Sequence, residues 1–126
     1  MKICISSVGN SVDSTMDPRF GRAAYFVISD TDTMESEIIE NSAAVSGGGA
    51  GITSGQLIVD KNVTAVITGN MGPNAMNVLK AANIEIYHGA AISVKENIEQ
   101  FKKGLLEKIN TTVPSHYGLG SQGEKK

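Results

Sequence analysis

The fold class is decided by the stretch Val63-Thr64-Ala65-Val66-Ile67-Thr68-Gly69-Asn70-Met71-Gly72-Pro73. Its first six residues form a nearly continuous β-branched run, which is typical of a strand covered on both faces. Gly69 to Gly72 end that strand, and Pro73 suits the first position of a helix. The expected helix carries an apolar face made by Ala75, Met76, Val78, Leu79 and Ala82. A strand followed directly by a helix indicates an α/β domain.

Further strands and helices are expected on both sides of this unit. The other predicted strands cover residues 2–7, 24–29, 35–40 and 84–87. Residues 30–34 suit a hairpin turn, so the first strands should be antiparallel neighbours. One more helix should follow the glycine-rich segment 47–51, and the last should begin at the capping box of Ser93 and Glu96. Its apolar stripe runs through Val94, Ile98, Phe101, Leu105 and Ile109.

The predicted order is βββαβαβα, which is a ribonuclease-H-like arrangement around a mixed five-stranded sheet. The 126 residues allow one domain, and we expect it at residues 1–109, followed by a flexible C-terminal tail at 110–126. The net charge of -2 gives no general attraction to nucleic acid, and the apolar runs are too short to span a membrane. These features favour a protein of the cytoplasm.

Both arginines of the chain lie in one short segment, Asp17-Pro18-Arg19-Phe20-Gly21-Arg22. A guanidinium group presents a rigid fork of donors to an oxyanion or a thio-anion. Pro18 and Gly21 constrain the loop, while Phe20 can either anchor it or cover a ligand. This clustering indicates an anion-binding loop.

A purely structural interpretation of the same segment remains open. In that alternative, Arg19 or Arg22 pairs with Asp13 or Asp17, and Phe20 fills the hydrophobic core.

Two glycine-rich segments, 47–51 and 69–74, each lie between a strand and a helix. Bare backbone amides and the positive end of a helix can approach an anion at such places, and neighbouring loops can line one crevice of an α/β sheet. We therefore predict one site made by the following residues: Arg19, Phe20, Gly21, Arg22, Gly48, Gly49 and Asn74. The alternative is that the glycines only permit tight turns. Neither segment has the pattern of an ATP- or NAD-binding loop.

The sequence offers no convincing catalytic group. The predicted strands 2–7 and 63–68 contain no acidic residue, which argues against a two-metal nuclease. Cys4 lies within a strand and should be a buried small hydrophobe, while His88 and His116 have no zinc-ligand spacing. No nucleophile elbow is present. We therefore expect a binding module with no protein ligand bonded directly to a metal, and not an enzyme.

Three separated motifs resemble the dinitrogenase iron-molybdenum cofactor biosynthesis family. They are residues 17–23 with the strand that follows, residues 47–52 and residues 69–75, and the likeness extends over about residues 1–105. The resemblance implies a ribonuclease-H-like fold and a role in carrying or inserting iron-molybdenum or related metal-sulfur clusters. Cluster-assembly or recipient proteins would then be partners.

One motif differs from that of the nitrogenase-pathway members and indicates which members of the family the chain resembles more. The chain has Arg19-Phe20-Gly21 where members of the nitrogenase pathway often have His-Phe-Gly, so it is more similar to stand-alone members, one of which holds a molybdenum-copper-sulfur cluster. Without that histidine or an available cysteine, noncovalent capture of an iron-molybdenum, iron-sulfur or molybdenum-copper-sulfur cluster is favoured over thiolate ligation. The competing hypothesis is a regulatory protein-interaction module with no inorganic ligand.

Overall fold

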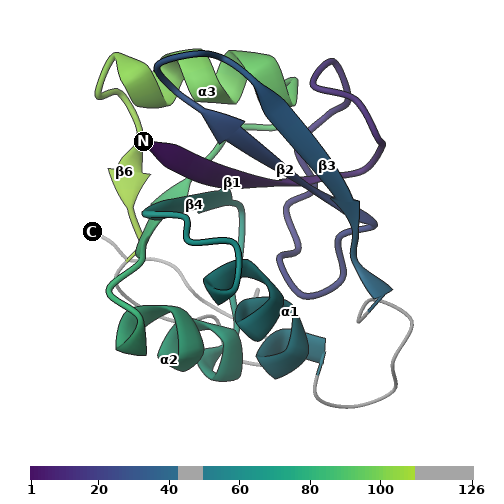
Figure 1. The fold of residues 1–126 in the computed structure, drawn as a ribbon, viewed down its shortest axis with the longest axis vertical. Coiled ribbons are helices and arrows are strands. Elements are labelled where there is room, and N and C mark those ends of the chain that lie inside the picture. Colours follow the sequence, from purple (N-terminus) through teal and green to yellow (C-terminus); the bar gives the residue numbers. More distant parts are fainter. Residues whose placement is uncertain (43–49, 110–126) are drawn as a thin grey trace, which may run out of the picture.

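The computed structural model describes residues 1–42 and 50–109, and Figure 1 shows how their helices and strands are arranged. The elements in chain order are β1 (Lys2–Ser7), β2 (Tyr25–Asp30), β3 (Ser36–Glu40), α1 (Ala50–Val59), β4 (Ala65–Thr68), α2 (Pro73–Ala81), β5 (Glu85–His88), α3 (Val94–Lys102) and β6 (Glu107–Lys108). The predicted order βββαβαβα is present in this part of the chain, with one further strand after it.

The strands form one mixed sheet in the order β3-β2-β1-β4-β5-β6. β2 pairs antiparallel with both β1 and β3, which confirms the prediction for the first three strands. β4 lies parallel to β1 and to β5, as expected for strands connected through helices. The predicted number of five strands was wrong, because β6 adds an antiparallel sixth strand beside β5.

The sixth strand exists because α3 ends earlier than its apolar stripe predicts. The stripe continues to Ile109, but the helix ends at Lys102. Gly104 has a φ angle of 73° and takes the left-handed conformation that glycine adopts readily. The Leu105 N–H then donates to the Gln100 carbonyl at 3.0 Å, which is the six-to-one hydrogen bond of a Schellman motif. This reversal returns the chain to the sheet.

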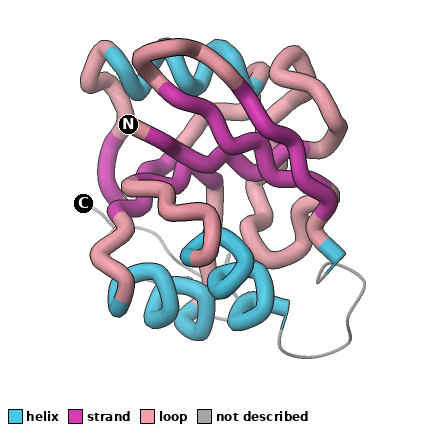
Figure 2. The backbone as a smooth tube through the Cα atoms, viewed as in Figure 1, coloured by secondary structure: helices cyan, strands magenta, loops and turns pink. Residues whose placement is uncertain are grey.

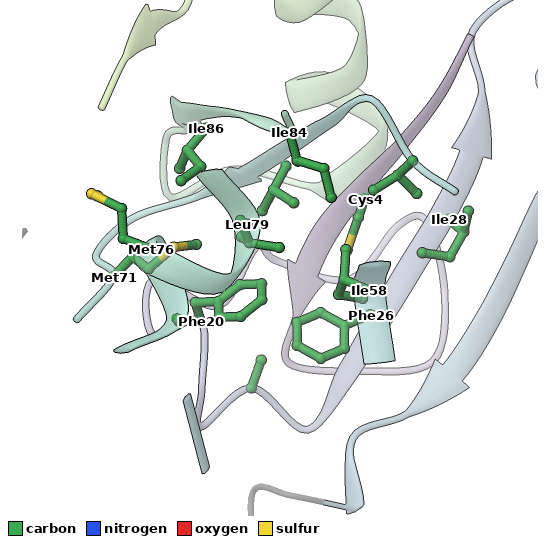
Figure 3. Packing of buried hydrophobic residues seen from close by; sticks show 14 residues of the cluster. Cys4, Phe20, Phe26, Ile28, Ile58, Met71, Met76, Leu79, Ile84 and Ile86 are labelled. Atoms are coloured by element: carbon green, nitrogen blue, oxygen red, sulfur yellow. The ribbon is translucent and has the colours of Figure 1, made fainter. Parts of the chain in front are cut away.

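Helices cover both faces of the sheet, with α1 and α2 on one side and α3 on the other (Figure 1). The α1–α2 face holds the larger hydrophobic cluster, in which Figure 3 shows Cys4, Phe20, Phe26, Ile58 and Leu79 packed together. The second cluster lies under α3 and includes Ile3, Ile5, Ile67, Val94 and Ile98. Because successive residues of β1 and β4 point to opposite clusters, both strands are buried on both faces, which the β-branched run predicts for β4.

Two predictions fall outside the described residues. Gly48 and Gly49 belong to the segment 43–49, and the predicted tail covers 110–126. Within the described part of the chain, no helix combines the length and the apolar character needed to cross a membrane.

Candidate functional site

The loop between β1 and β2 folds back over the carboxyl end of β4, beside α1 (Figure 1), and Figure 2 marks it as irregular structure. The Asn70 N–H donates to the Pro18 carbonyl at 2.6 Å, and the Phe20 N–H donates to the Asn70 carbonyl at 3.2 Å. Arg19 and Asn70 thereby form a parallel β-bridge. A Cβ atom on Gly69 would lie 2.7 Å from both the Cα and the Cβ of Pro18, so only glycine allows this close approach.

A buried hydroxyl pair fixes the middle of the loop, at Asp17, to the ends of β1 and β4. The Ser6 hydroxyl donates to the Asp17 carbonyl at 2.6 Å and shares a second hydrogen bond with the Thr68 hydroxyl at 2.8 Å. The Asp17 N–H donates to the Ser6 carbonyl at 2.9 Å. Since Ser6, Asp17 and Thr68 are all buried, these bonds lie away from water and hold the loop firmly.

The far end of the loop is tied to α1 and to the end of β3. The Asn41 side-chain amide donates to the carbonyl oxygens of Ala23 at 2.9 Å and Gly21 at 3.3 Å. The Ser54 hydroxyl of α1 donates to the Asn41 side-chain oxygen at 3.1 Å. Asn41 and Ser54 are both buried, so this network joins three separate elements at one point.

The first turn of α1 contacts this loop on one side and the first turn of α2 on the other. A Cβ atom on Gly21 would lie 3.4 Å from the Cα of Gly51 in α1. A Cβ atom on Gly51 would in turn lie 3.5 Å from the backbone nitrogen of Ala75 in α2. The described parts of the three motifs in residues 17–23, 47–52 and 69–75 therefore converge in space.

The start of α2 carries no side-chain cap. Gly72 is the N-cap residue and has no side chain to accept a hydrogen bond, and Pro73 has no N–H of its own. Asn74 follows on the exposed surface of the first turn. The positive end of the helix dipole at these amides favours a negatively charged group.

Arg19 forms a close ion pair with Asp17. Its Nε and Nη2 atoms lie 3.2 Å and 3.1 Å from the two carboxylate oxygens, and its backbone N–H donates to the same carboxylate at 2.9 Å. The Asp17 side chain is 3% exposed, while that of Arg19 is 64% exposed. The hydrogen bond to Asp17 raises the pKa of the Arg19 guanidinium above its ordinary value. Arg19 therefore takes the pairing foreseen in the structural interpretation, and still presents a large exposed surface.

Phe20 anchors the loop in the core. Its side chain is 1% exposed and its ring centroid lies 5.1 Å from that of Phe26 (Figure 3). Of the two alternatives for this residue, the structure shows the anchoring one, and its ring forms no part of the exposed surface.

Arg22 differs from Arg19 in its surroundings. Its side chain is exposed and makes no hydrogen bond or ion pair with any residue in the ranges 1–42 and 50–109. It directly follows Gly21, whose backbone contacts α1. The donors of Arg22 are therefore available to a ligand as far as the described residues are concerned.

The structure offers no thiolate at this site. Cys4 lies in the middle of β1 and is fully buried, as predicted, and burial raises the pKa of its thiol well above the ordinary value of 9.0. Over residues 1–42 and 50–109, no group of three or more histidine, cysteine, aspartate or glutamate side chains gathers in a way that could hold a metal ion.

The sequence of the chain matches one protein family over most of its length. Residues 1–104 match the family described as dinitrogenase iron-molybdenum cofactor. The chain belongs to this family. All of the converging segments lie inside the matched range.

Solved structures of similar proteins have the same fold. The apo form of the orange protein from Desulfovibrio gigas superimposes with a TM-score of 0.82 at 32% identity, covering 86% of this chain and 92% of that one. A Thermotoga protein studied by NMR gives a TM-score of 0.80 at 37% identity, covering 90% and 97%. An uncharacterized protein of Methanocaldococcus jannaschii is 36% identical over 113 residues, which are 86% of this chain and 96% of the relative.

The sequence did not reveal several residues that shape the site. Asn70 pairs with the loop, and it does so through its backbone. Asn41 and Ser54 support the loop from β3 and α1. No pattern marks these two residues, because a buried pair of polar side chains from distant segments has no fixed spacing. The signal that was available is Gly69, a strand-end glycine that allows another backbone to approach.

Proposed function

We propose that this protein binds an anionic metal-sulfur cluster noncovalently and carries it to or from cluster-assembly or recipient proteins. The observation that supports this most directly is the pair of close contacts from Gly21 to Gly51 and from Gly51 to Ala75, which gathers the arginine-bearing loop and the first turns of α1 and α2 in one place. Membership of the iron-molybdenum cofactor family supports a cluster as the ligand.

The proposed binding mode uses hydrogen-bond donors only. Arg22 and the exposed edge of Arg19 supply guanidinium N–H groups, and the first turn of α2 at Asn74 supplies amides and a favourable dipole. Gly48 and Gly49 would add further amides before α1. Phe20 and Gly21 would act indirectly, since one anchors the loop and the other permits its close packing.

Finer features of the function form part of the same proposal. The cluster would be of the iron-molybdenum, iron-sulfur or molybdenum-copper-sulfur type, and the protein would hold it without catalysing a reaction. We propose that the protein acts in the cytoplasm, where reducing conditions preserve both a free thiol and metal-sulfide clusters. The strand order β3-β2-β1-β4-β5 supports a ribonuclease-H-like fold that β6 extends.

Anaerobic reconstitution tests the proposal. Purified protein is mixed with tetrathiomolybdate, with tetrathiomolybdate and cuprous ion, or with iron and sulfide, and is then separated by gel filtration. We expect visible charge-transfer absorption and metal to elute with the protein in at least one mixture, and a protein lacking this site, treated identically, to elute without them. Elution of metal-free protein from all three mixtures would contradict the proposal.

One observation favours the competing hypothesis of an interaction module. Arg19 is paired with Asp17 and Phe20 lies in the core, as a purely structural loop requires. If that hypothesis holds, the reconstitution yields no bound metal, and replacing Arg22 by alanine changes only the affinity for a protein partner.

A further inference from the structure

We propose that Asp17 is a positioning residue for anion binding, which holds one edge of the Arg19 guanidinium so that the other edge faces the ligand. This inference rests on the proposed function and assigns different roles to the two arginines. Arg19 would be a fixed donor held by Asp17, whereas Arg22 would be an adaptable donor that reaches the anion from the surface.

Asp17 is itself rigidly placed. Its backbone N–H and carbonyl both bond to Ser6 at the end of β1, over distances of 2.9 Å and 2.6 Å. Its carboxylate is 3% exposed and accepts its three hydrogen bonds from Arg19. A buried carboxylate that is fixed to a central strand can orient a bound guanidinium, because the carboxylate itself has little freedom to move.

The pairing leaves part of the guanidinium unused. A guanidinium group has five N–H donors, and the two contacts to Asp17 occupy the Nε–H and one N–H of Nη2. The Nη1 donors and the second N–H of Nη2 remain, on a side chain that is 64% exposed. Arginine can therefore bind Asp17 and an anion at once, which the single ammonium group of lysine cannot do with the same geometry.

Ligand binding should leave the pair of Arg19 and Asp17 intact, because the Asp17 carboxylate is buried. Removing the only cationic partner of a buried carboxylate is strongly unfavourable, and Arg19 is that partner among the described residues. The backbone bridge between Arg19 and Asn70 also fixes the position from which the Arg19 side chain extends, near the start of α2. Ligand binding should therefore use Arg19 in the orientation seen here.

Neutralising Asp17 should change the affinity for the anion in the direction opposite to that expected from simple electrostatics. Asp17 carries a negative charge near the proposed anion, so Coulomb repulsion alone predicts that replacing it by a neutral residue tightens binding. If Asp17 positions Arg19, the same replacement weakens binding, because the guanidinium loses its fixed orientation. The direction in which Asp17→Asn changes the affinity therefore distinguishes a positioning role from simple Coulomb repulsion.

The experiment is a double-mutant cycle measured with tetrathiomolybdate under anaerobic conditions. The variants are Asp17→Asn, Arg19→Ala and the combination of both, each checked for folding by circular dichroism and thermal melting. We expect Asp17→Asn to weaken binding by about ten-fold in the wild-type background, and to have almost no effect when Arg19 is already alanine. Equal or tighter binding by Asp17→Asn, or an equal loss in both backgrounds, would overturn the inference.

Arg19→Lys gives a second test that does not depend on the stability of Asp17→Asn. This variant keeps the charge next to Asp17, and we expect it to fold and yet lose about as much affinity as Arg19→Ala. Wild-type affinity in Arg19→Lys would overturn the positioning role while leaving the proposed function in place. A wild-type protein that retains neither thiomolybdate nor any reconstituted cluster would instead overturn both.

Discussion

Asn70 and Pro18 are joined by a 2.6 Å hydrogen bond from the Asn70 N–H to the Pro18 carbonyl, across two segments that are far apart in the sequence. The Asn70 carbonyl also accepts from Phe20, so both backbone groups of one residue hold the arginine-bearing loop. This contact holds the loop over the carboxyl end of the central strand β4, and its geometry sets the backbone position from which the Arg19 side chain extends.

Gly69→Ala should disrupt this contact. The added Cβ would come within 2.7 Å of Pro18, and relieving such a clash in a packed region costs about 1–3 kcal/mol of unfolding free energy. Urea denaturation measures this change. Gly51→Ala is the matched control, since its Cβ would meet nothing closer than 3.5 Å and should leave stability equal or raised. Equal stability of the two variants would show that the loop can move away without cost.

Arg22→Ala should separate binding from folding. The exposed side chain contacts no described residue through a hydrogen bond or ion pair, so the free energy of unfolding should change by less than about 0.5 kcal/mol. Loss of a charge-assisted contact should weaken cluster binding by about ten-fold to a hundred-fold. Titration with thiomolybdate measures the second quantity, and Lys95→Ala on the opposite helix, α3, is the control. Unchanged affinity in Arg22→Ala would remove this residue from the site.

Gly72→Asp should stabilise the protein and weaken its ligand binding together. Aspartate at the N-cap of α2 can accept from the helix amides, which is worth a few tenths of a kcal/mol relative to glycine. The same carboxylate would occupy those amides and repel an anion. Gly72→Ser, which caps without charge, should show a smaller loss of affinity in the same titration. If both variants bind as the wild type does, the start of α2 takes no part in binding.

Cys4→Ala should retain the cluster and change the pH dependence of stability. Burial raises the pKa of the Cys4 thiol in the folded protein, so the folded state keeps a proton that the unfolded state loses above the ordinary value of 9.0. Stability therefore falls as the pH rises above about 9, by up to about 1.4 kcal/mol per pH unit. Denaturation between pH 8 and 10.5 should show a shallower fall in Cys4→Ala. Loss of all metal from this variant would contradict noncovalent binding.

The central part of the fold could be predicted because its signals are local. The β-branched run ending at Thr68 and the Pro73 that starts the next helix each indicate one kind of element, and the structure has both. The end of α3 could not be predicted in this way. Leu105 and Ile109 continue the helical spacing, and the left-handed conformation of Gly104 shows only in the structure.

The site was predictable to a smaller extent, for a related reason. The clustering of Arg19 and Arg22 marked the loop, but the sequence left open whether either arginine was paired, and the structure shows that Arg19 is. The contacts that hold the loop run through backbone atoms of Asn70 and buried side chains of Asn41 and Ser54. Such contacts depend on how distant segments meet and leave no repeating pattern.

The bridge between Arg19 and Asn70 also has a consequence for the order of events during synthesis. The loop leaves the ribosome well before β4 and α2, so a growing chain has the arginines but not the surface that holds them. Under the proposed function, a cluster would then bind only to the finished domain. Such a cluster would bind the native state and oppose unfolding by mass action, so a loaded molecule should outlast an empty one in the presence of proteases.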